Sequence, residues 1–171
     1  MNFMKMQLQN SNQPRKILFL DIDGVLNSYA VNYGRKDWPE CCYDPSLCRN
    51  LKQVLDETGA EIVVSSTWRE ETYLLDRFPI IFENWGIGHV PVGITTTDNL
   101  CFPRKMSDYT WHERNRAMQI QQWVNQHKPA AWIAVDDLAL PLPKEHFVRT
   151  NRNRGLIIHK AKEAIDKLQV Q

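Results

Sequence analysis

The chain has 171 residues, of which 43% are hydrophobic and 24% are charged, and its net charge is +1. These values are typical of one globular domain and exclude a chain that is disordered over most of its length. The near balance of charge argues against a protein that holds nucleic acid by its overall charge, and leaves local basic patches open. No apolar run approaches the length of about 18 residues that a membrane span needs. Residues 1–14 are polar, unlike a secretory signal, so we expect a flexible tail at 1–14 and a single domain at 15–171.

The cysteines predict a cytoplasmic protein with free thiols. They lie at 41, 42, 48 and 101, so none forms a CxxC pair, and adjacent cysteines are poorly placed for a mutual disulfide. A zinc site built from the first three and a distant His is a less favoured alternative, because the spacing does not match. Free thiols in a reducing compartment are the simpler interpretation.

Short apolar runs and amphipathic stretches alternate in the first half of the chain. Residues 16–21 form a continuous apolar run that ends in acidic residues and Gly24, which is typical of a strand buried on both faces. Asp44 and Pro45 carry the N-cap and first-turn signals of a helix, and Gly59 ends it. The further elements expected are a strand at 61–65, a helical stretch at 68–86 broken near Pro79, and a weaker edge strand at 90–95.

The same alternation continues to the end of the chain and predicts an α/β fold. The expected elements are a loop at 96–111, a helix at 112–127, strands at 131–135 and 147–150, and a C-terminal helix whose buried stripe is Ile158, Ala161, Ile165 and Leu168. Strands that alternate with helices indicate a three-layer sandwich, in which a parallel sheet lies between helices. We expect the strand at 16–21 to be central, between 61–65 and 131–135.

Polar residues follow three of these strands at the point where each one ends. They are Asp21, Asp23 and Gly24 after the first strand, Ser65-Ser66-Thr67 after the second, and Asp136-Asp137 after the strand at 131–135. Any one of these could simply start a turn or cap a helix. Ligands of open parallel sheets bind at the carboxyl edge, so the ordered set of three predicts a functional site there.

The three segments resemble the motifs of haloacid dehalogenase (HAD) superfamily phosphatases. FLDIDGVLN at 19–27 is similar to their first motif, IVVSSTWR at 62–69 to the second, and WIAVDD at 132–137 to the fourth. The SSTWR segment, the stretch at 116–123 and the Gly-Leu pair at 155–156 are most similar to the small HAD domains of Swiss-army-knife RNA repair proteins. The resemblance implies a HAD-like, Rossmannoid fold without a cap domain, or with a minimal cap at 27–43.

The resemblance also implies roles for the residues after the strands. Asp21 would be the nucleophile, Asp23 the general acid and base, and Gly24 the turn that comes near the phosphate. Ser65 would bind a phosphoryl oxygen. The implied cofactor is Mg²⁺, held by Asp21, by the backbone carbonyl of Asp23 and by one acid of the last pair. We favour Asp137 as the direct ligand with Asp136 behind it, and the reverse assignment stays open.

The basic residue of the third motif is less clear in this sequence. Lys105, Arg114 and Arg116 are the candidates for neutralising the nucleophile and the phosphate. We favour Arg116, with Arg114 second, because the helix pattern around 116–123 matches the subfamily. Ser66 and Arg69 are further substrate-binding candidates, and Arg69 could instead pair with the neighbouring acids Glu70 and Glu71.

The function implied is a Mg²⁺-dependent phosphomonoesterase that acts through an aspartyl-phosphate on a nucleotide or polynucleotide terminal phosphate, in a nucleic acid repair setting. The expected partner is a phosphorylated substrate, including nucleic-acid ends, and no membrane. A small-metabolite phosphatase is the alternative, and a non-catalytic phosphate-binding or signalling module is a third hypothesis that the DxD after the first strand disfavours. Basic and aromatic residues expected near the mouth of the site are Arg104, Lys105, Tyr109, Trp111, Arg149, Arg152 and Arg154, with Trp38 and Trp85 as further candidates.

Overall fold

The computed structural model describes residues 15–28, 42–101 and 108–170, with the side chains at 108 and 109 excepted. Its centre is a five-stranded parallel sheet in the order β3-β2-β1-β4-β5. The strand bounds are β1 Lys16–Leu20, β2 Glu61–Val64, β3 Gly93–Ile94, β4 Ala131–Asp136 and β5 Phe147–Arg149. The prediction that the first strand lies between the second and the strand at 131–135 is confirmed.

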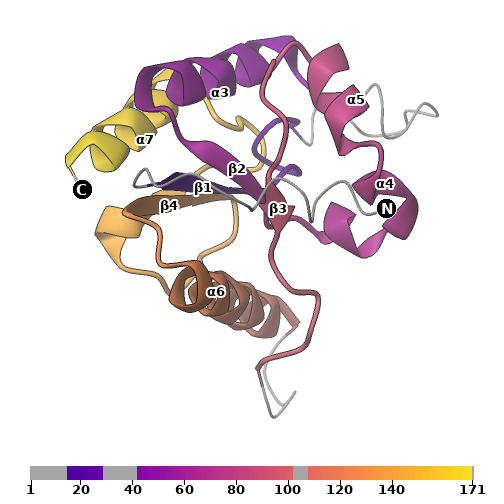
Figure 1. Ribbon diagram of the computed structural model, residues 1–171, viewed down its shortest axis with the longest axis vertical. Helices are drawn as coiled ribbons and strands as arrows, with labels where there is room; N and C mark the ends of the chain where they lie inside the picture. The colour runs from indigo at the N-terminus through magenta and orange to yellow at the C-terminus, as the bar shows by residue number, and fades with distance from the viewer. Residues whose placement is uncertain (1–14, 29–41, 102–107, 171) are drawn as a thin grey trace.

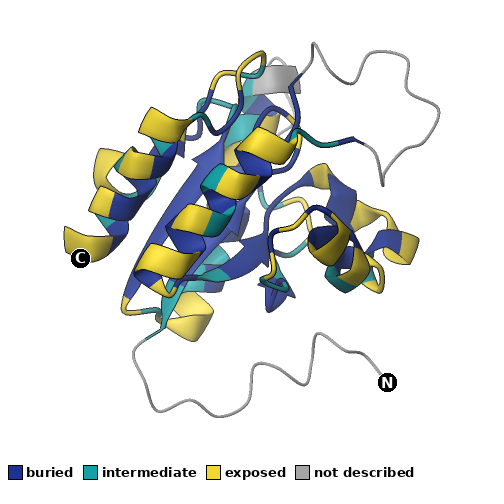
Figure 2. Cartoon of the chain, turned by 90° about the horizontal axis from the view of Figure 1, so that it is seen from above, coloured by how far each residue is buried: buried dark blue, intermediate teal, exposed yellow. Residues whose placement is uncertain are grey.

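Helices cover both faces of the sheet, as predicted for a three-layer α/β sandwich. Helices α3 (Pro45–Thr58) and α7 (Ile158–Val170) lie together on one face, and α6 (Asp108–His127) lies on the other (Figure 1). The burial pattern agrees, because the strands and the inward sides of the helices are buried while the outer sides are exposed (Figure 2). None of the helices in the described ranges combines the length and apolarity that a membrane span requires.

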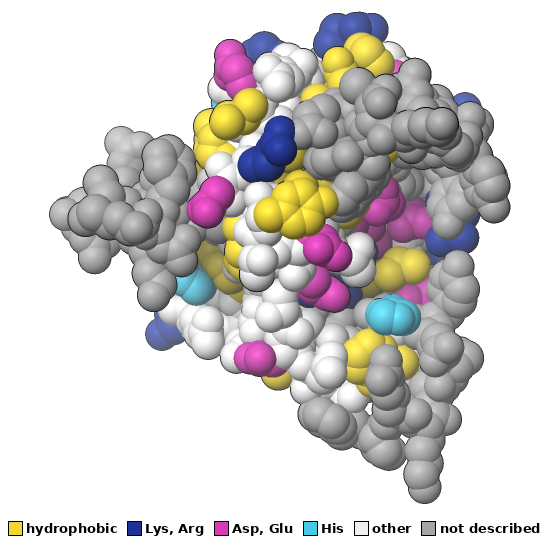
Figure 3. Space-filling model, turned by 90° about the vertical axis from the view of Figure 1, so that its right-hand side faces the viewer, with side chains coloured by type: hydrophobic (Ala, Val, Ile, Leu, Met, Phe, Trp, Pro, Cys, Tyr) yellow, Lys and Arg dark blue, Asp and Glu magenta, His cyan; other side chains and the backbone are white. Residues whose placement is uncertain are grey.

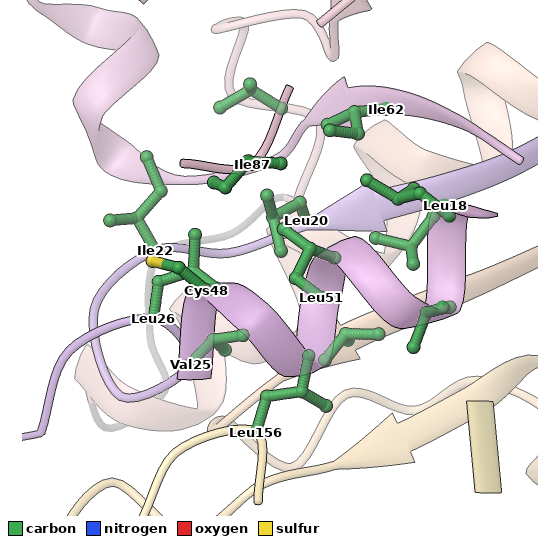
Figure 4. Close-up of a cluster of buried hydrophobic side chains, with 14 of the residues drawn as sticks. Leu18, Leu20, Ile22, Val25, Leu26, Cys48, Leu51, Ile62, Ile87 and Leu156 are labelled. Atoms are coloured by element: carbon green, nitrogen blue, oxygen red, sulfur yellow. The ribbon is translucent and has the colours of Figure 1, made fainter. Parts of the chain in front are cut away.

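Strand β1 contributes side chains to the hydrophobic cores on both faces of the sheet. Leu18 and Leu20 pack in the core under α3 and α7, together with Leu51 (Figure 4). Ile17 and Phe19 point to the opposite face and pack with residues of α6. All four β1 side chains are fully buried, and each stabilises the fold by about 1.5–3 kcal/mol. The residue after β1 is therefore held by a rigid strand.

Helix α3 begins and ends as its sequence predicts. The side chain of Asp44 accepts a hydrogen bond from Ser46 N, and Pro45 occupies the first turn. Gly59 has a φ of +66° and donates its N–H to the carbonyl of Leu55. Both ends are thus capped by the residue types that suit them.

The segment after β2 is more broken than expected. It consists of η1 (Thr67–Glu70), α4 (Thr72–Leu75) and α5 (Phe78–Asn84). Pro79 lies in the first turn of α5, where a proline is tolerated, so the break precedes it. Strand β3 is only two residues long and lies at the sheet edge, as expected for a segment that contains Pro91.

One helix boundary and one core residue differ from the prediction. Helix α6 begins at Asp108, so the expected loop at 96–111 is shorter, because no Gly or Pro between 108 and 111 stops the helix. Ile158 is 58% exposed, because it is the first residue of α7 and lies outside the buried face of that helix. Ala164 is buried in the stripe that Ile158 was expected to join. A short 3₁₀ turn, η2 (Lys144–His146), precedes β5.

Candidate active site

Three aspartates meet at the carboxyl edge of the sheet. Leu20 of β1 pairs with Val135 of β4, so Asp21 and Asp136 directly follow paired positions. The N–H of Asp21 donates to the carbonyl of Val135 at 3.0 Å. One carboxylate oxygen from each of Asp21, Asp136 and Asp137 lies within 4.8 Å of the other two. Parallel pairing therefore brings together residues that are more than a hundred positions apart in the sequence.

Arg116 of α6 joins two of these carboxylates. Its Nη1 atom donates to Asp21 Oδ2 and to Asp136 Oδ2, each at 2.7 Å. All three side chains are at least nine-tenths buried. Burial alone would lower the pKa of Arg116, but the negative charges of Asp21 and Asp136 raise it above its usual value. The guanidinium is therefore permanently charged and holds the Asp21 carboxylate in one orientation.

The two acids after β4 have different surroundings. Both oxygens of Asp136 are engaged, because Oδ2 accepts from Arg116 and Oδ1 accepts from Leu138 N at 2.9 Å. Asp137 is only partly buried, and its Oδ2 accepts from Arg152 Nε at 3.2 Å. Burial, and then repulsion from Asp21, raises the pKa of both Asp136 and Asp137.

The charges of this cluster suit a hard cation. Three carboxylates share a small volume with the guanidinium groups of Arg116 and Arg152, so negative charge is in excess. Among the described residues, these aspartates form the one group of His, Cys, Asp or Glu side chains close enough to hold a metal ion. Oxygen ligands of this kind fit Mg²⁺. Cys48 and Cys101 are free and buried, Cys42 is also buried, and these cysteines contribute no zinc site to the described ranges.

Asp23 lies at the mouth of the site and is held from two sides. Its side chain is exposed, yet Oδ1 accepts from Asn27 Nδ2 and Oδ2 accepts from the indole Nε1 of Trp68, both at 2.8 Å. The turn that follows Asp23 begins with Gly24, whose φ is +75°. A Cβ atom on Gly24 would lie 2.8 Å from Asp137 Cγ, so the absence of a side chain at position 24 leaves room for the Asp137 carboxylate.

The segment Ser65-Ser66-Thr67 places its three hydroxyl groups differently. Ser65 Oγ is buried and has no hydrogen-bond partner in the described part of the chain. Ser66 is also buried, and its Oγ caps η1 by accepting from Trp68 N. Thr67 is exposed and lines the pocket that holds Asp21 and Asp23. Thr67 is thus the residue of this segment that lines the pocket.

The family model of the HAD domain in Swiss Army Knife RNA repair proteins matches residues 17–161. The chain belongs to this family. The match covers the strands that carry Asp21, Ser65 and Asp136, so the resemblance drawn from the three motifs is confirmed. No curated protein and no solved structure matches the chain.

A small pocket lies at the carboxyl edge of the sheet of this HAD domain, and we call it the candidate catalytic pocket. The pocket has a volume of about 140 Å³ and is lined by Asp21, Asp23, Thr67, Arg116, Asp137, Leu138 and Arg152. Figure 3, a view onto the right-hand side of Figure 1, shows acidic side chains gathered in a hollowed part of this face.

Two larger pockets adjoin the candidate catalytic pocket of this HAD domain. One, of about 270 Å³, shares Thr67 and Arg116 with it. The other, of about 340 Å³, shares Asp137, Leu138 and Arg152 and is also lined by Arg149. Trp111 lines the first of these pockets, as expected for a residue near the mouth. Both pockets extend the open space beside the candidate catalytic pocket.

Several residues that the sequence placed at the site lie elsewhere. Arg114 is exposed on α6 and lines none of the three pockets, because positions two apart on a helix face different sides. Arg154 is likewise exposed and outside these pockets. Trp85 is buried in the core, stacked against Tyr43 and Phe82. The tail at 1–14, residues 29–41 of the flap expected at 27–43, with Trp38, and the candidates Arg104, Lys105 and Tyr109 fall outside the described residues or side chains.

Arg69 and three supporting residues give the site contacts that sequence reasoning missed. Arg69 is 3% exposed and pairs with neither Glu70 nor Glu71, because its guanidinium points inward to Thr96 and Gln119. Asn27 lies inside the first motif and Trp68 inside the second. This position in the motifs was the only sequence feature that could have identified them as part of the site. Thr150, whose Oγ1 donates to Gly24 O at 2.8 Å, has no sequence signal of its own.

Proposed function

We propose that this HAD domain is a Mg²⁺-dependent phosphomonoesterase that acts through an aspartyl-phosphate on the terminal phosphate of a nucleotide or polynucleotide. The observation that carries the proposal is the single guanidinium nitrogen of Arg116, 2.7 Å from both Asp21 and Asp136, beside Asp137. The family's link to RNA repair supports a nucleic-acid substrate.

The first step is an attack by Asp21 on phosphorus. Its Oδ1 accepts from Ile22 N at 2.9 Å and its Oδ2 accepts from Arg116, so the carboxylate is fixed before substrate binds. A carboxylate oxygen forms a bond to phosphorus while the bond from phosphorus to the ester oxygen breaks. Asp23 donates a proton to the departing oxygen, which leaves as an alcohol. Preorganisation of this kind spares the reaction the cost of orienting the nucleophile.

The second step is hydrolysis of the aspartyl-phosphate. Asp23, now ionised, accepts a proton from water, and the water oxygen attacks phosphorus. The bond between phosphorus and the Asp21 oxygen breaks, which releases inorganic phosphate and restores the carboxylate. The hydrogen bonds from Asn27 and Trp68 hold Asp23 at the mouth for both proton transfers. Proton transfer by a positioned side chain contributes about 10²–10⁴-fold to the rate.

The aspartates would hold the Mg²⁺ ion. Asp21 and Asp137 are the proposed carboxylate ligands, together with the backbone carbonyl of Asp23, and Asp136 supports them from behind because Arg116 and Leu138 N already occupy its oxygens. When bound, the ion neutralises the charge of the phosphate and of the acids around it.

A phosphatase assay of the purified protein tests this function. We expect release of phosphate from 3′- or 5′-phosphorylated oligonucleotides with Mg²⁺ present, loss of release with a chelator, and no release by Asp21→Asn. The Asn side chain has the same shape but is a poor nucleophile. Turnover by Asp21→Asn at the wild-type rate would exclude the covalent mechanism. Failure of the wild-type protein to hydrolyse any phosphomonoester with Mg²⁺ would exclude the function.

A small-metabolite phosphatase is the second candidate. The pocket of about 270 Å³ beside the catalytic pocket favours it, because this volume lies near the lower end of the range for small-molecule sites, roughly 300–1,000 Å³. Higher kcat/KM on mononucleotides or sugar phosphates than on oligonucleotides would select this candidate.

A further inference from the structure

The pocket of about 270 Å³ beside the catalytic pocket, which we call the Arg69 pocket, contains a buried positive charge. Arg69, Thr67 and Arg116 line it, and the last two also line the catalytic pocket. A group bound in the Arg69 pocket is therefore next to a phosphate bound at Asp21.

Every hydrogen-bond acceptor of Arg69 is neutral. Nη1 donates to the carbonyl of Ser66, Nε and Nη2 donate to the carbonyl of Thr96, and Nη2 also donates to Gln119 Oε1. A guanidinium has five N–H donors, so these bonds leave one on Nη1. No carboxylate forms an ion pair with Arg69 in the ranges that the structure describes. Arg116, by contrast, contacts two carboxylates.

Arg69 therefore has no carboxylate at ion-pair distance among the described residues, and the negative charges of Glu70, Asp21 and Asp136 act on it only from farther away. Burial, and then repulsion from Arg116, lowers the pKa of Arg69 to about 10, which leaves it protonated at neutral pH. Removing a charge from water is unfavourable unless a charge of opposite sign is near. An anion in the Arg69 pocket would supply that charge.

Neutral donors complete the pocket. Asn115 Oδ1 accepts from Leu100 N at 2.6 Å and from Cys101 N at 3.1 Å. The Nδ2 donors of the same amide therefore point away from residues 100 and 101. Asn115 and Thr67 line the pocket with Asn99. Among the described residues that line the pocket, Glu70 is the one with an acidic side chain, and it lies exposed at the rim. The interior thus offers a cation and amide or hydroxyl donors, which suits an anionic group.

We propose that the Arg69 pocket binds a second anionic group, carried by the leaving group of the substrate. The inference rests on the proposed function, because it assumes that the catalytic pocket holds the phosphate to be removed. The substrate class is then a compact bisphosphate, or a nucleotide whose terminal phosphomonoester lies one sugar away from another phosphate. Such a group occurs in a nucleoside bisphosphate, at the end of a nucleic-acid strand, and in a sugar bisphosphate.

Two matched pairs of substrates test the proposal and distinguish these sources. The first pair is a nucleoside 3′,5′-bisphosphate and the nucleoside 3′-monophosphate, and the second is a hexose 1,6-bisphosphate and the hexose 6-phosphate. In at least one pair, we expect kcat/KM of the wild-type protein to be about tenfold or more higher for the bisphosphate, since hydrogen bonds to charged groups are strong. The preference should disappear in Arg69→Gln and persist in part in Arg69→Lys.

A pair of exposed acids provides the matched control and avoids the risk that Arg69→Gln does not fold. Glu70→Gln removes a negative charge from the rim of the Arg69 pocket, so the preference for the bisphosphate should increase. Glu71→Gln makes the same change on the next residue, which is exposed and does not line the pocket. An equal effect of the two variants would overturn the assignment of the second anion to this pocket.

Binding to the Asp21→Asn variant separates this inference from the proposed function. Calorimetric titration with each substrate gives Kd without turnover, and Arg69→Gln in the same background should remove the tighter binding of the bisphosphate. Tighter binding with no turnover by the wild-type protein would support the pocket and exclude the phosphatase. Turnover without any preference for a bisphosphate, in both pairs, would exclude the second-anion site and leave the phosphatase standing.

Discussion

The indole Nε1 of Trp68 donates a hydrogen bond of 2.8 Å to Oδ2 of Asp23, a residue 45 positions earlier in the chain. The other oxygen of Asp23 accepts from Asn27 Nδ2, so both oxygens of an exposed carboxylate are held. Trp68 itself is buried and packs edge-on against Trp85, with ring centroids 5.9 Å apart. The orientation of the proposed general acid and base is therefore set by a rigid aromatic side chain.

We predict that Trp68→Phe lowers kcat by roughly tenfold, because it removes one hydrogen bond to a charged group and preserves most of the apolar contact. KM should change little, since Trp68 holds Asp23 and does not line the catalytic pocket. Steady-state kinetics of the variant and the wild-type protein gives kcat and KM separately.

Trp85→Phe is the control for this variant, because it removes the same kind of ring from the same aromatic cluster. It should reduce stability without the selective loss of kcat. If the two variants lose kcat equally, packing accounts for the effect and Trp68 has no positioning role.

Arg116→Gln should destabilise the fold by about 3–5 kcal/mol, because it leaves the carboxylates of Asp21 and Asp136 buried without their cation. Added Mg²⁺ should restore part of the lost stability, since a divalent cation compensates the same charges. Denaturant unfolding with and without Mg²⁺ measures the change. Arg114→Gln, two residues earlier on the exposed side of α6, should alter stability by less than about 0.5 kcal/mol.

The contrast between these arginines shows what the sequence could and could not predict. The continuous apolar run of β1 and the caps of α3 follow from local residue preferences, and both were predicted correctly. The meeting of Asp21 with Asp136 follows from the rule that parallel strands end at one edge. The choice between Arg114 and Arg116 depends on the rotation of α6 about its axis. The sequence pattern around 116–123 favoured Arg116 but did not determine that rotation.

Contacts across broken segments could not be predicted in this way. Arg69 lies in η1, a short turn whose direction depends on how it packs against the rest of the fold. The hydrogen bond from its guanidinium to Gln119 therefore could not be predicted from the neighbouring sequence. The exposure of Thr67 and the burial of Ser65 likewise follow from the path of the chain after β2. Sequence reasoning therefore located the edge of the sheet correctly and left the side-chain directions on it undecided.

The two acids after β4 should differ in their effect on metal binding. Asp137→Asn should weaken Mg²⁺ binding more than Asp136→Asn, because Arg116 and Leu138 N already occupy the oxygens of Asp136. Asp136→Asn should instead weaken the contact to Arg116 and reduce stability. Calorimetric titration of each variant with Mg²⁺ gives the affinities. The reverse ranking would assign Asp136 as the direct ligand.

Gly24→Ala should disturb both folding and metal binding. A Cβ atom there would lie 2.8 Å from Asp137 Cγ, and the φ of +75° costs about 1–2 kcal/mol for a residue other than glycine. Gly59→Ala is the matched control, because its φ is +66° and nothing lies within 4 Å of the added atom. Both variants should lose stability through the backbone, and Gly24→Ala alone should also lose affinity for Mg²⁺. Equal Mg²⁺ affinity in the two variants would show that Asp137 tolerates displacement.

Cys48 should make the stability of the fold depend on pH in alkaline solution. Burial raises the pKa of its thiol from 9.0 to about 12. Below pH 9 the thiol is protonated in both the folded and the unfolded chain, so it adds no pH dependence. Between pH 9 and pH 12 the unfolded chain loses the proton first, so the free energy of unfolding falls as the pH rises.

The expected fall is about 1.4 kcal/mol for each pH unit in this window. Other groups also titrate there, so the measurement is the difference between the wild-type protein and Cys48→Ala in denaturant unfolding at pH 8, 9.5 and 10.5. Cys48→Ala should be less stable at pH 8, because it leaves a cavity beside Leu51 and Leu26, but its stability should fall less steeply above pH 9. Parallel curves for the two proteins would mean that the thiol ionises as readily in the folded chain as in the unfolded one, and that the core around it admits water.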